Sequence, residues 1–421
     1  MDYFEITGGN RLRGTLTVNG SKNAALPIMA ASILTDGETV LKGVPRLEDV
    51  KHLSGLLEKL GVNVWRGENG DLHLKVEDEM NCHAEYELVR KMRASVCVMG
   101  PLLAKRKRAQ VSLPGGCNIG DRPIDLHVSG MQQLGAESEL LSGDVHLKAK
   151  KLKGNVVFLG GPFGSTVLGT ANVMMAAVLA EGTTVIECAA CEPEVTDLAN
   201  YLNACGAHIS GQGTPRITIE GVRELHGCEY TVVPDRIEAG TFMIAAAITN
   251  GDVKIANCRL DHLLALVDRL KAVGVIVERS GDYVQVSSSR RLEPISVTTQ
   301  PYPGFPTDLQ AQIMTLLCLA DGNSIITEKI FPDRFVHVAE LNRMGARLRK
   351  EGPTVIVEGV KNLVGAPVMA SDLRASAALV LAGLVAKGKT KLSRVYHIDR
   401  GYEKIEERLN AVGADIKRLP E

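Results

Sequence analysis

The segment 112–127 holds the densest group of reactive side-chain types in the chain. It combines Cys117, Arg122, Asp125 and His127 with three glycines and two prolines, a content that excludes a regular helix or strand and predicts an irregular loop. Loops of this kind often carry function. Arg122 follows Cys117 by five positions, and a nearby positive charge favours the thiolate, the reactive form of cysteine. The segment therefore predicts a reactive thiol, with an ordinary loop and an exposed cysteine as the alternative.

Ser21, Lys22 and Asn23 stand directly before an apolar run over 24–33. Ser21 is expected to cap a helix that begins there, which places Lys22 and Asn23 at the positive end of the helix. A lysine in that position is suited to bind a phosphate group. The alternative is that Lys22 is a solvated charge in the first helical turn.

Arginines beside apolar runs form a further group of candidates. Arg334, Arg374 and Arg400 each stand where a helix or strand could end. The planar guanidinium matches carboxylate and phosphate groups, so these side chains could hold an anionic substrate. They could equally pair with neighbouring aspartates such as Asp372 and Asp399 as structural salt bridges.

Asp308 follows a turn segment, 303–306, that contains two prolines and a glycine. Thr307 or Asp308 could simply cap the helix that follows. The other interpretation makes Asp308 a general base held at a rigid turn.

An internal repeat indicates which elements position these residues. A tripeptide of an apolar residue, Gly and a small or β-branched residue recurs six times, roughly 70 residues apart, a longer period than that of small solenoid repeats. The central glycines are Gly61, Gly135, Gly206, Gly274, Gly345 and Gly413. Each tripeptide ends an amphipathic run at helical spacing, so each glycine is expected to cap a helix in the left-handed conformation before a strand begins.

An Ala-rich helix followed by a strand is expected further upstream in most repeats. The expected helices include 176–182 and 377–388, with strands at 183–186 and 390–392. Each repeat then contains strands alternating with two helices, which predicts the α/β (α+β) class. Six units of this size must pack together, and two groups of three make two domains of ordinary size. Propeller blades lack paired helices, which disfavours that architecture.

Composition narrows the class of protein. A net charge of −1 and 4% aromatic residues argue against a general nucleic-acid binder. The first residues lack the pattern of a signal peptide, no apolar stretch is long enough to span a bilayer, and nine scattered cysteines do not indicate a disulfide framework. We therefore expect a cytoplasmic protein that does not insert into membranes. Neither a Walker A motif, a GxGxxG motif nor metal-ligand spacing is present, so no cofactor or metal is predicted.

Taken together, five segments in this order resemble the enolpyruvyl transferase family: 20–24, 114–127, 304–312, 372–375 and 396–401. The resemblance extends from about Phe4 to about Ile416. It implies an inside-out α/β barrel of two globular domains, each with three βαβαββ units. It also implies that the chain crosses between the domains twice, giving domains at 22–232 and at 1–21 with 233–421, and that the substrates bind between them.

The chemistry that the resemblance implies is transfer of the enolpyruvyl group of phosphoenolpyruvate to the 3-hydroxyl of UDP-N-acetylglucosamine, a step of peptidoglycan synthesis. Phosphate leaves from a tetrahedral ketal, and such a reaction needs an acid, a base and cations. By resemblance, Cys117 is the general acid, forms an adduct with phosphoenolpyruvate and is alkylated by the epoxide fosfomycin. Asp308 is the base near the 3-hydroxyl.

The substrate-binding residues follow from the same resemblance. Lys22, Arg122 and Arg400 would hold phosphoenolpyruvate, with Arg334 and Arg374 supporting its carboxylate. The segment 122–126 would enclose the uracil, and the backbone of Ile330 would meet the sugar. The further residues implied in binding the substrates are Asn23, Arg93, Pro123, Ile124, Asp125, Leu126, His127, Thr166, Val167 and Asp372.

One segment departs from the family pattern. The family commonly has Ser-Val-Gly-Ala-Thr at the diphosphate site, whereas this chain has Ser-Thr-Val-Leu-Gly-Thr over 165–170. Thr166 keeps a hydroxyl, but Leu168 replaces a small glycine, which puts the diphosphate contacts in question.

Two other functions compete with this interpretation. A 5-enolpyruvylshikimate-3-phosphate synthase shares the fold and the donor but lacks the cysteine-bearing loop. A non-catalytic paralogue that binds UDP-sugar would be expected to tolerate loss of Cys117 and Asp308, and both are present. An RNA-processing cyclase on a related repeat lacks support, because no catalytic-histidine motif or basic groove is evident.

Overall fold

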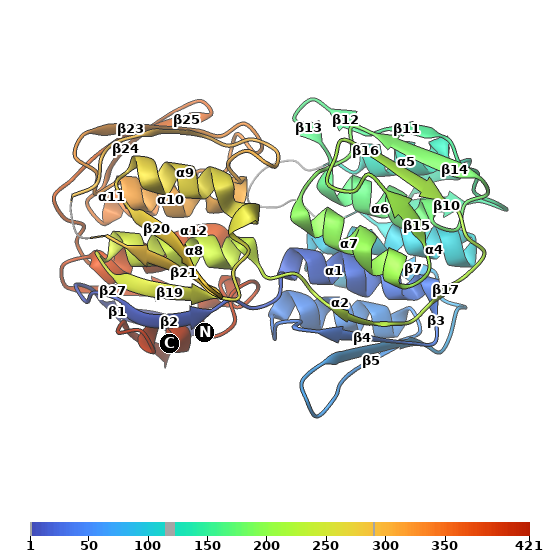
Figure 1. Ribbon diagram of the computed structural model, residues 1–421, viewed down its shortest axis with the longest axis horizontal. Helices are drawn as coiled ribbons and strands as arrows, with labels where there is room; N and C mark the ends of the chain where they lie inside the picture. The colour runs from blue at the N-terminus through green and yellow to red at the C-terminus, as the bar shows by residue number, and fades with distance from the viewer. Residues whose placement is uncertain (1, 114–122, 289–290) are drawn as a thin grey trace. The chain divides into compact units, whose positions relative to one another are not determined.

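The computed structural model describes residues 2–113, 123–288 and 291–421. The described chain divides into two compact units. The 20–233 unit contains the described residues between those numbers, and the 234–421 unit also contains residues 2–19. Each unit has a hydrophobic core of its own. Both are built from strands and helices that Figure 1 labels along the chain.

One repeat of the 20–233 unit shows the arrangement on which both units are built. Its main elements follow in the order β11 (Val156–Phe158), α6 (Val167–Ala177), β14 (Thr183–Glu187), α7 (Pro193–Ala204), β15 (His208–Ser210) and β16 (Arg216–Glu220). Strand β11 pairs parallel with β14, and β16 lies between β14 and β15, antiparallel to both. The repeat is therefore a βαβαββ unit with one parallel crossover.

The other two sheets of the 20–233 unit have the same strand directions. In spatial order, their strands are β18 (Glu229–Thr231), β4 (Glu38–Lys42), β6 (Leu72–Val76) and β5 (Val62–Arg66), and β7 (His83–Ala84), β8 (Arg108–Ser112), β10 (Asp144–Lys148) and β9 (Glu137–Leu141). Strand β18, at the end of the unit, thus completes the sheet that begins at its start. Short pairs also form between β12 (Gly160–Gly161) and β13 (Gly164–Ser165), and between β3 (Thr35–Asp36) and β17 (Leu225–His226).

Three four-stranded sheets of the same kind build the 234–421 unit. In spatial order they contain β2 (Arg13–Thr17), β19 (Asp252–Ala256), β21 (Tyr283–Ser287) and β20 (Ile276–Ser280); β22 (Ser296–Thr298), β23 (Asn323–Thr327), β25 (Thr354–Glu358) and β24 (Arg347–Glu351); and β26 (Pro367–Met369), β27 (Lys389–Ser393), β1 (Asp2–Thr7) and β28 (Asp415–Pro420). The N-terminal strands β1 and β2 thus complete two of these sheets.

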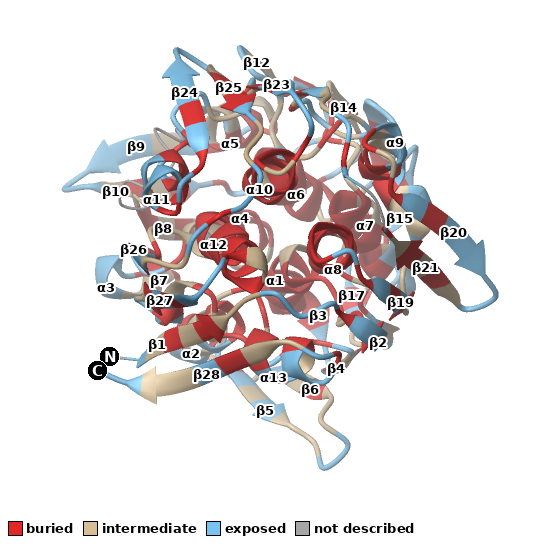
Figure 2. Cartoon of the chain, turned by 90° about the vertical axis from the view of Figure 1, so that its left-hand side faces the viewer, coloured by how far each residue is buried: buried red, intermediate tan, exposed pale blue. Residues whose placement is uncertain are grey.

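The first long helix of each repeat is buried on nearly all sides. These helices are α1 (Lys22–Ala31), α4 (Met99–Arg106) and α6 in the 20–233 unit, and α8 (Arg236–Ile248), α10 (Gln310–Leu317) and α12 (Leu373–Val385) in the other. Apart from Arg374 and Ser376, α12 carries only small and apolar residues around its circumference, so it has no polar face to present to water. Figure 2 shows α8, α10 and α12 in red, with strands of the three sheets around them.

The second helix of each repeat is amphipathic and half-buried. These helices are α2 (Glu48–Lys59), α5 (Asp125–Gln133), α7, α9 (Leu264–Ala272), α11 (His337–Arg343) and α13 (Ile405–Asn410). Strands such as β25 alternate between buried and half-buried or exposed residues, because one face of each sheet packs on the helices and the other is turned toward solvent. Helices inside and sheets outside make each unit the inside-out α/β arrangement that the family resemblance implies.

The left-handed glycines predicted from the repeat are confirmed. All six have positive φ angles, between 82° at Gly61 and 107° at Gly413. The predicted bounds of the Ala-rich helices were wrong in detail. Helix α6 ends at Ala177 rather than continuing to 182, and α12 begins at Leu373 and ends at Val385 because Asp372 caps its start and Ala386 is already extended.

Two further expectations concern cysteines and membranes. The eight cysteines among the described residues are free thiols, as predicted. Across the described ranges, no helix is both long enough and apolar enough to cross a membrane.

Two helical glycines should respond in opposite ways to substitution by alanine. A Cβ on Gly100 in α4 would lie 2.2 Å from the Asn172 carbonyl oxygen on α6, whereas a Cβ on Gly55 in α2 meets nothing within 4 Å. We expect Gly100→Ala to destabilise the protein by about 1–3 kcal/mol through overpacking. Gly55→Ala should stabilise it by about 0.5–1 kcal/mol. Urea unfolding followed by circular dichroism measures both, and equal midpoints for the two variants would contradict the packing of α4 on α6.

Candidate functional site

The carboxylate of Asp308 lies between two buried arginines in the 234–421 unit. Its Oδ1 is 2.8 Å from Nη1 of Arg334, and its Oδ2 is 3.0 Å from Nη2 of Arg374. Arg334 is 7% exposed and Arg374 is 3% exposed, while the Asp308 side chain is 26% exposed. Asp308 belongs to the short helix η4 (Thr307–Leu309), and neither η4 nor α10 has a side-chain N-cap. The alternative that Thr307 or Asp308 merely caps a helix is therefore wrong.

A buried glutamate supports the Arg334 side of this carboxylate. Arg334 Nη1 also donates to the Thr307 hydroxyl at 3.0 Å, and that hydroxyl donates to Glu328 at 2.9 Å. Glu328 is fully buried and accepts from the backbone N–H of Ile330 at 2.8 Å and of Phe331 at 3.0 Å. One carboxylate thus holds both the turn before Asp308 and the backbone of Ile330.

A buried tyrosine supports the Arg374 side. Arg374 Nη1 donates to the hydroxyl of Tyr402 at 3.2 Å, and the guanidinium carbon lies 5.5 Å from the centre of the Tyr402 ring. Burial alone would lower the pKa of Arg374, but Tyr402, Asp308 and Asp235 together raise it above its usual value. Arg374 therefore keeps its positive charge inside the protein.

The aspartates that could have paired with these arginines have other partners. Asp372 caps α12, because its Oδ1 accepts from the backbone N–H of Arg374 at 3.0 Å and of Ala375 at 3.1 Å. Asp399 forms a two-pronged ion pair with Arg418, at 2.6 and 3.0 Å. These contacts do not include the structural salt bridges that the sequence suggested, which were Asp372 with Arg374 and Asp399 with Arg400.

Arg400 lies in the segment that follows β27 and is half-buried. Burial lowers the pKa of His397, the charge of Arg400 lowers it further, and Asp372 opposes this shift. Burial also lowers the pKa of His337 to about 4. The negative charge of Asp372 opposes this shift, and the positive charge of Arg334 adds to it. The structure therefore gathers the predicted charged residues of this unit near the first turn of α12.

Lys22 is the corresponding buried cation of the 20–233 unit. Ser21 caps α1 as predicted, accepting from the backbone N–H of Ala24 at 3.3 Å. Lys22 is buried, and its Nζ lies 3.0 Å from Oδ2 of the buried Asp49 on α2. It is not the solvated charge of the alternative interpretation. Asn23 is half-buried beside it in the first turn of α1.

Three predicted segments of the 20–233 unit meet through short contacts. Arg93 Nη2 donates to the carbonyl oxygen of Pro123 at 3.1 Å, just before α5. In the start of α5, Asp125 is exposed, and a Cβ on Gly161 would lie 3.1 Å from Cδ1 of Leu126. The start of α5 thus packs beside the hairpin of β12 and β13, and Ile124, just before α5, is buried.

That hairpin leads directly into the start of α6. Thr166 caps α6, accepting from the backbone N–H of Gly169 at 3.2 Å, and Val167 is exposed in the first turn. No acidic residue lies in this turn, so the positive end of the helix dipole is not neutralised there. Gly169 leaves room for the cap, since a Cβ there would lie 2.4 Å from Thr166 Cγ2. Leu168, the departure from the family pattern, is half-buried.

His127 lies inside the protein, 2% exposed. Its Nδ1 accepts from the side-chain amide of Asn172 at 2.9 Å, and Asn172 also holds the carbonyl oxygen of Val96 and the backbone N–H of Gly100. Burial, with the charge of Arg93, lowers the pKa of His127 to about 3. Its contact with a substrate stays a prediction.

Two of the predicted residues, Cys117 and Arg122, lie outside the described residues. Sequence analysis missed four buried polar partners: Asp49, Asn172, Glu328 and Tyr402. None belongs to a local motif, and each is identified only by the contacts it makes.

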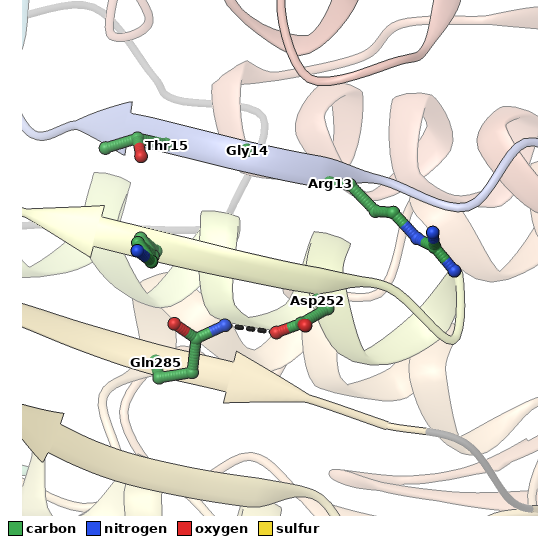
Figure 3. Close-up of a pocket in the computed structure, with 6 residues that line it drawn as sticks. Arg13, Gly14, Thr15, Asp252 and Gln285 are labelled. Carbon is green, nitrogen blue, oxygen red and sulfur yellow. Dashed lines mark hydrogen bonds between the residues drawn. The ribbon is translucent and has the colours of Figure 1, made fainter.

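An open depression of about 480 Å³ lies elsewhere, on strands β2, β19 and β21. Figure 3 shows Arg13, Thr15, Asp252 and Gln285 along it, with Gln285 donating to Asp252. It contains none of the predicted site residues.

The fold is similar to that of solved enolpyruvyl transferases. The enolpyruvyl transferase NikO from Streptomyces tendae matches with a TM-score of 0.89 at 24% identity, covering 100% of this chain and 99% of that one. EPSP synthase from Acinetobacter baumannii matches with a TM-score of 0.77 at 20% identity, covering 100% of both chains. At these identities the likeness establishes the two-domain fold and no more.

Sequence comparison identifies the family. A family model described as EPSP synthase (3-phosphoshikimate 1-carboxyvinyltransferase) matches residues 6–409. A relative from Methylacidiphilum infernorum is 53% identical, over 100% of this chain and 99% of its own length, and one from Nitratidesulfovibrio vulgaris is 52% identical over 100% of both. Both carry the name UDP-N-acetylglucosamine 1-carboxyvinyltransferase, as does a relative from Akkermansia muciniphila at 50% identity, over 100% of this chain and 99% of its own. The chain belongs to the EPSP synthase family of enolpyruvyl transferases.

The buried His127 should make stability depend on pH. Because its pKa falls from 6.5 to about 3 on folding, the unfolded chain takes up a proton below pH 6.5 that the folded protein does not bind. Stability is therefore complete above pH 6.5 and falls as the pH drops, by about 3 kcal/mol at pH 4 from this residue alone.

His127→Asn keeps an acceptor near Asn172 but cannot titrate. Urea midpoints between pH 4 and 7 should therefore fall less steeply for this variant than for the wild type. Identical slopes would show that His127 is not held neutral.

Proposed function

We propose that the chain transfers the enolpyruvyl group of phosphoenolpyruvate to the 3-hydroxyl of UDP-N-acetylglucosamine and releases phosphate. In the cell it would be a cytoplasmic transferase of peptidoglycan synthesis. The observation that carries the proposal is the Asp308 carboxylate held by two buried arginines, in a chain 50–53% identical to relatives named for this reaction.

Asp308 is suited to be the general base. Two guanidinium groups favour the ionised form of a carboxylate, which is the form that accepts a proton from the sugar hydroxyl. Its partial exposure leaves it accessible, whereas both arginines are buried. A guanidinium carries five N–H donors, and the bonds of Arg374 to Asp308 and Tyr402 use two of these. Further donors of Arg334 and Arg374 would support the carboxylate of phosphoenolpyruvate.

The acid in this scheme is Cys117, which protonates the methylene carbon of phosphoenolpyruvate. The adjacent carbon then becomes electrophilic, the 3-hydroxyl oxygen bonds to it, and Asp308 takes the hydroxyl proton. The resulting ketal then loses phosphate and one proton of its new methyl group, which gives the enolpyruvyl ether. Lys22, Arg122 and Arg400 would stabilise the anionic oxygens, as cations do in such transition states.

The 20–233 unit would supply the nucleotide contacts. Arg93, the start of α5 from Pro123 to Leu126, and the hairpin before α6 lie together. The capped start of α6 at Thr166 and Val167 offers a positive helix end for the diphosphate. Asn23 would reach the sugar. Because the N–H of Ile330 is held by Glu328, a sugar contact at Ile330 would use its carbonyl oxygen.

A shikimate acceptor is the second candidate, because the family model is named for 3-phosphoshikimate. The named relatives at 50–53% identity favour the UDP-sugar, and the solved EPSP synthase is only 20% identical. A sensor without catalysis is disfavoured by the retained Asp308 and its arginines.

Phosphate release tests the acceptor and the base together. With phosphoenolpyruvate, the wild type should release phosphate with UDP-N-acetylglucosamine and not with shikimate 3-phosphate. Asp308→Asn should reduce the rate by about a hundredfold or more, the usual size of general-base catalysis.

Asp261→Asn is the matched control, since Asp261 also pairs with an arginine, Arg259, but outside the site. It should keep the wild-type rate, and unfolding midpoints should show that all variants are folded. Phosphate release with shikimate 3-phosphate but not with UDP-N-acetylglucosamine would favour the second candidate. No release with either acceptor would favour a sensor without catalysis.

Alkylation tests Cys117 independently. Fosfomycin with saturating UDP-N-acetylglucosamine should add one inhibitor mass to the intact protein, because the thiolate opens the epoxide. Cys117→Asp keeps an acid but should stay unmodified. An added mass on that variant would identify another target, and an unmodified wild type would contradict the assignment of Cys117.

A further inference from the structure

The hydroxyl of Tyr402 lies where the three buried helices of the 234–421 unit meet. It is 2.8 Å from Oγ1 of Thr241 on α8, 3.3 Å from Nε2 of Gln312 on α10 and 3.2 Å from Nη1 of Arg374 on α12. Figure 2 shows these three helices together. Tyr402 itself is 1% exposed. One oxygen atom thus joins one side chain from each helix.

The direction of each hydrogen bond follows from the available protons. The Thr241 hydroxyl donates to the carbonyl oxygen of Ile237 at 2.8 Å, so it accepts from Tyr402. The Tyr402 oxygen is then left to accept from Arg374. It also lies within reach of Gln312, whose two amide protons are shared among Tyr402, Thr241 and the Asp308 carbonyl oxygen. Burial raises the pKa of Tyr402, which keeps the hydroxyl protonated and neutral. The bond from Arg374 is therefore made to a neutral acceptor of fixed orientation.

Arg374 has two side-chain anchors of different character. Its Nη2 binds the carboxylate of Asp308 at 3.0 Å, and its Nη1 binds the Tyr402 hydroxyl. In the proposed reaction Asp308 takes up a proton and loses its charge, which weakens the first anchor. The second anchor does not depend on the charge of Asp308. Gln312 adds to the link, since its Nε2 also donates to the backbone carbonyl of Asp308 at 2.9 Å.

We propose that Tyr402 is a positioning residue, which holds the Arg374 guanidinium in place while Asp308 carries the proton of the acceptor hydroxyl. This inference rests on the proposed function. It assigns the effect of Tyr402 to the stage of the reaction at which Asp308 is neutral. Loss of the Tyr402 hydroxyl should therefore lower kcat, while KM for both substrates changes little.

Tyr402→Phe removes this oxygen alone. We expect kcat to fall about tenfold or more, as for loss of a hydrogen bond to a charged group, with KM within about twofold of the wild type. Tyr201→Phe is the matched control, because Tyr201 is also fully buried and its hydroxyl also meets a buried threonine, Thr39, at 3.2 Å. That variant should keep the wild-type kcat. A wild-type kcat for Tyr402→Phe would overturn the inference.

A double-mutant cycle separates positioning from a general structural effect. If Tyr402 acts through Arg374, adding Tyr402→Phe to Arg374→Ala should not lower kcat further. Effects that multiply would show that Tyr402 acts elsewhere and would overturn the inference. If Tyr402→Phe does not fold, Thr241→Val replaces it, since it removes the acceptor that orients the hydroxyl. It should lower kcat in the wild type and not in Arg374→Ala.

The failure of the inference and that of the proposed function are distinguishable. An active wild type with a wild-type-like Tyr402→Phe overturns the inference alone. A folded wild type that releases no phosphate overturns the proposed function, and the inference with it.

Discussion

A four-stranded sheet that buries one face needs something apolar to cover it, and a single βαβαββ unit has too few helices to do so. Three such units solve this by sharing their first helices as one core. The solution favours small and apolar residues around most of the circumference of those helices, because they touch other helices as well as sheets. The polar side chains that they do bury, such as Thr241, Gln312 and Arg374, are hydrogen-bonded. Gly100 on α4, in contact with α6, shows how closely they approach.

Burial within this core also determines which groups must accompany each charged side chain at the site. Arg334 and Arg374 are buried, and a buried cation is costly unless a carboxylate and further hydrogen bonds accompany it. Asp308 provides the carboxylate for both, while Thr307 and Tyr402 provide the additional acceptors. The proposed base is therefore also a structural counter-ion. Catalytic and structural requirements coincide on one residue, so its variants must be judged by folding as well as by rate.

Short sequence patterns predicted the structural features that depend on interactions between neighbouring residues. The six capping glycines, the Ser21 cap and the α/β class follow from short patterns, and the structure confirms each. The ends of α6 and α12 were misplaced, because Ala, Val and Leu continue past the point where the chain leaves the helix.

Partners distant in sequence could not be predicted. Thr241 and Tyr402 are 161 positions apart, and Arg374 and Asp308 are 66 apart. Nothing near Asp399 indicates that Arg418, rather than Arg400, is its partner. The resemblance to a family supplied candidate residues at the site, whereas the buried side chains that hold them became evident only from the fold.

Strand β1 has a consequence for the order in which the chain can fold. It lies between β27 and β28, and Glu5 contacts Lys389, 384 positions away. On a ribosome, the 20–233 unit has all of its strands once β18 has emerged, and domains generally fold as they become available. Strands β1 and β2 are made earlier still, yet β1 must wait for nearly the whole chain before its neighbours exist. The 234–421 unit is therefore the last to close, and its first strand stays exposed for the longest time during synthesis.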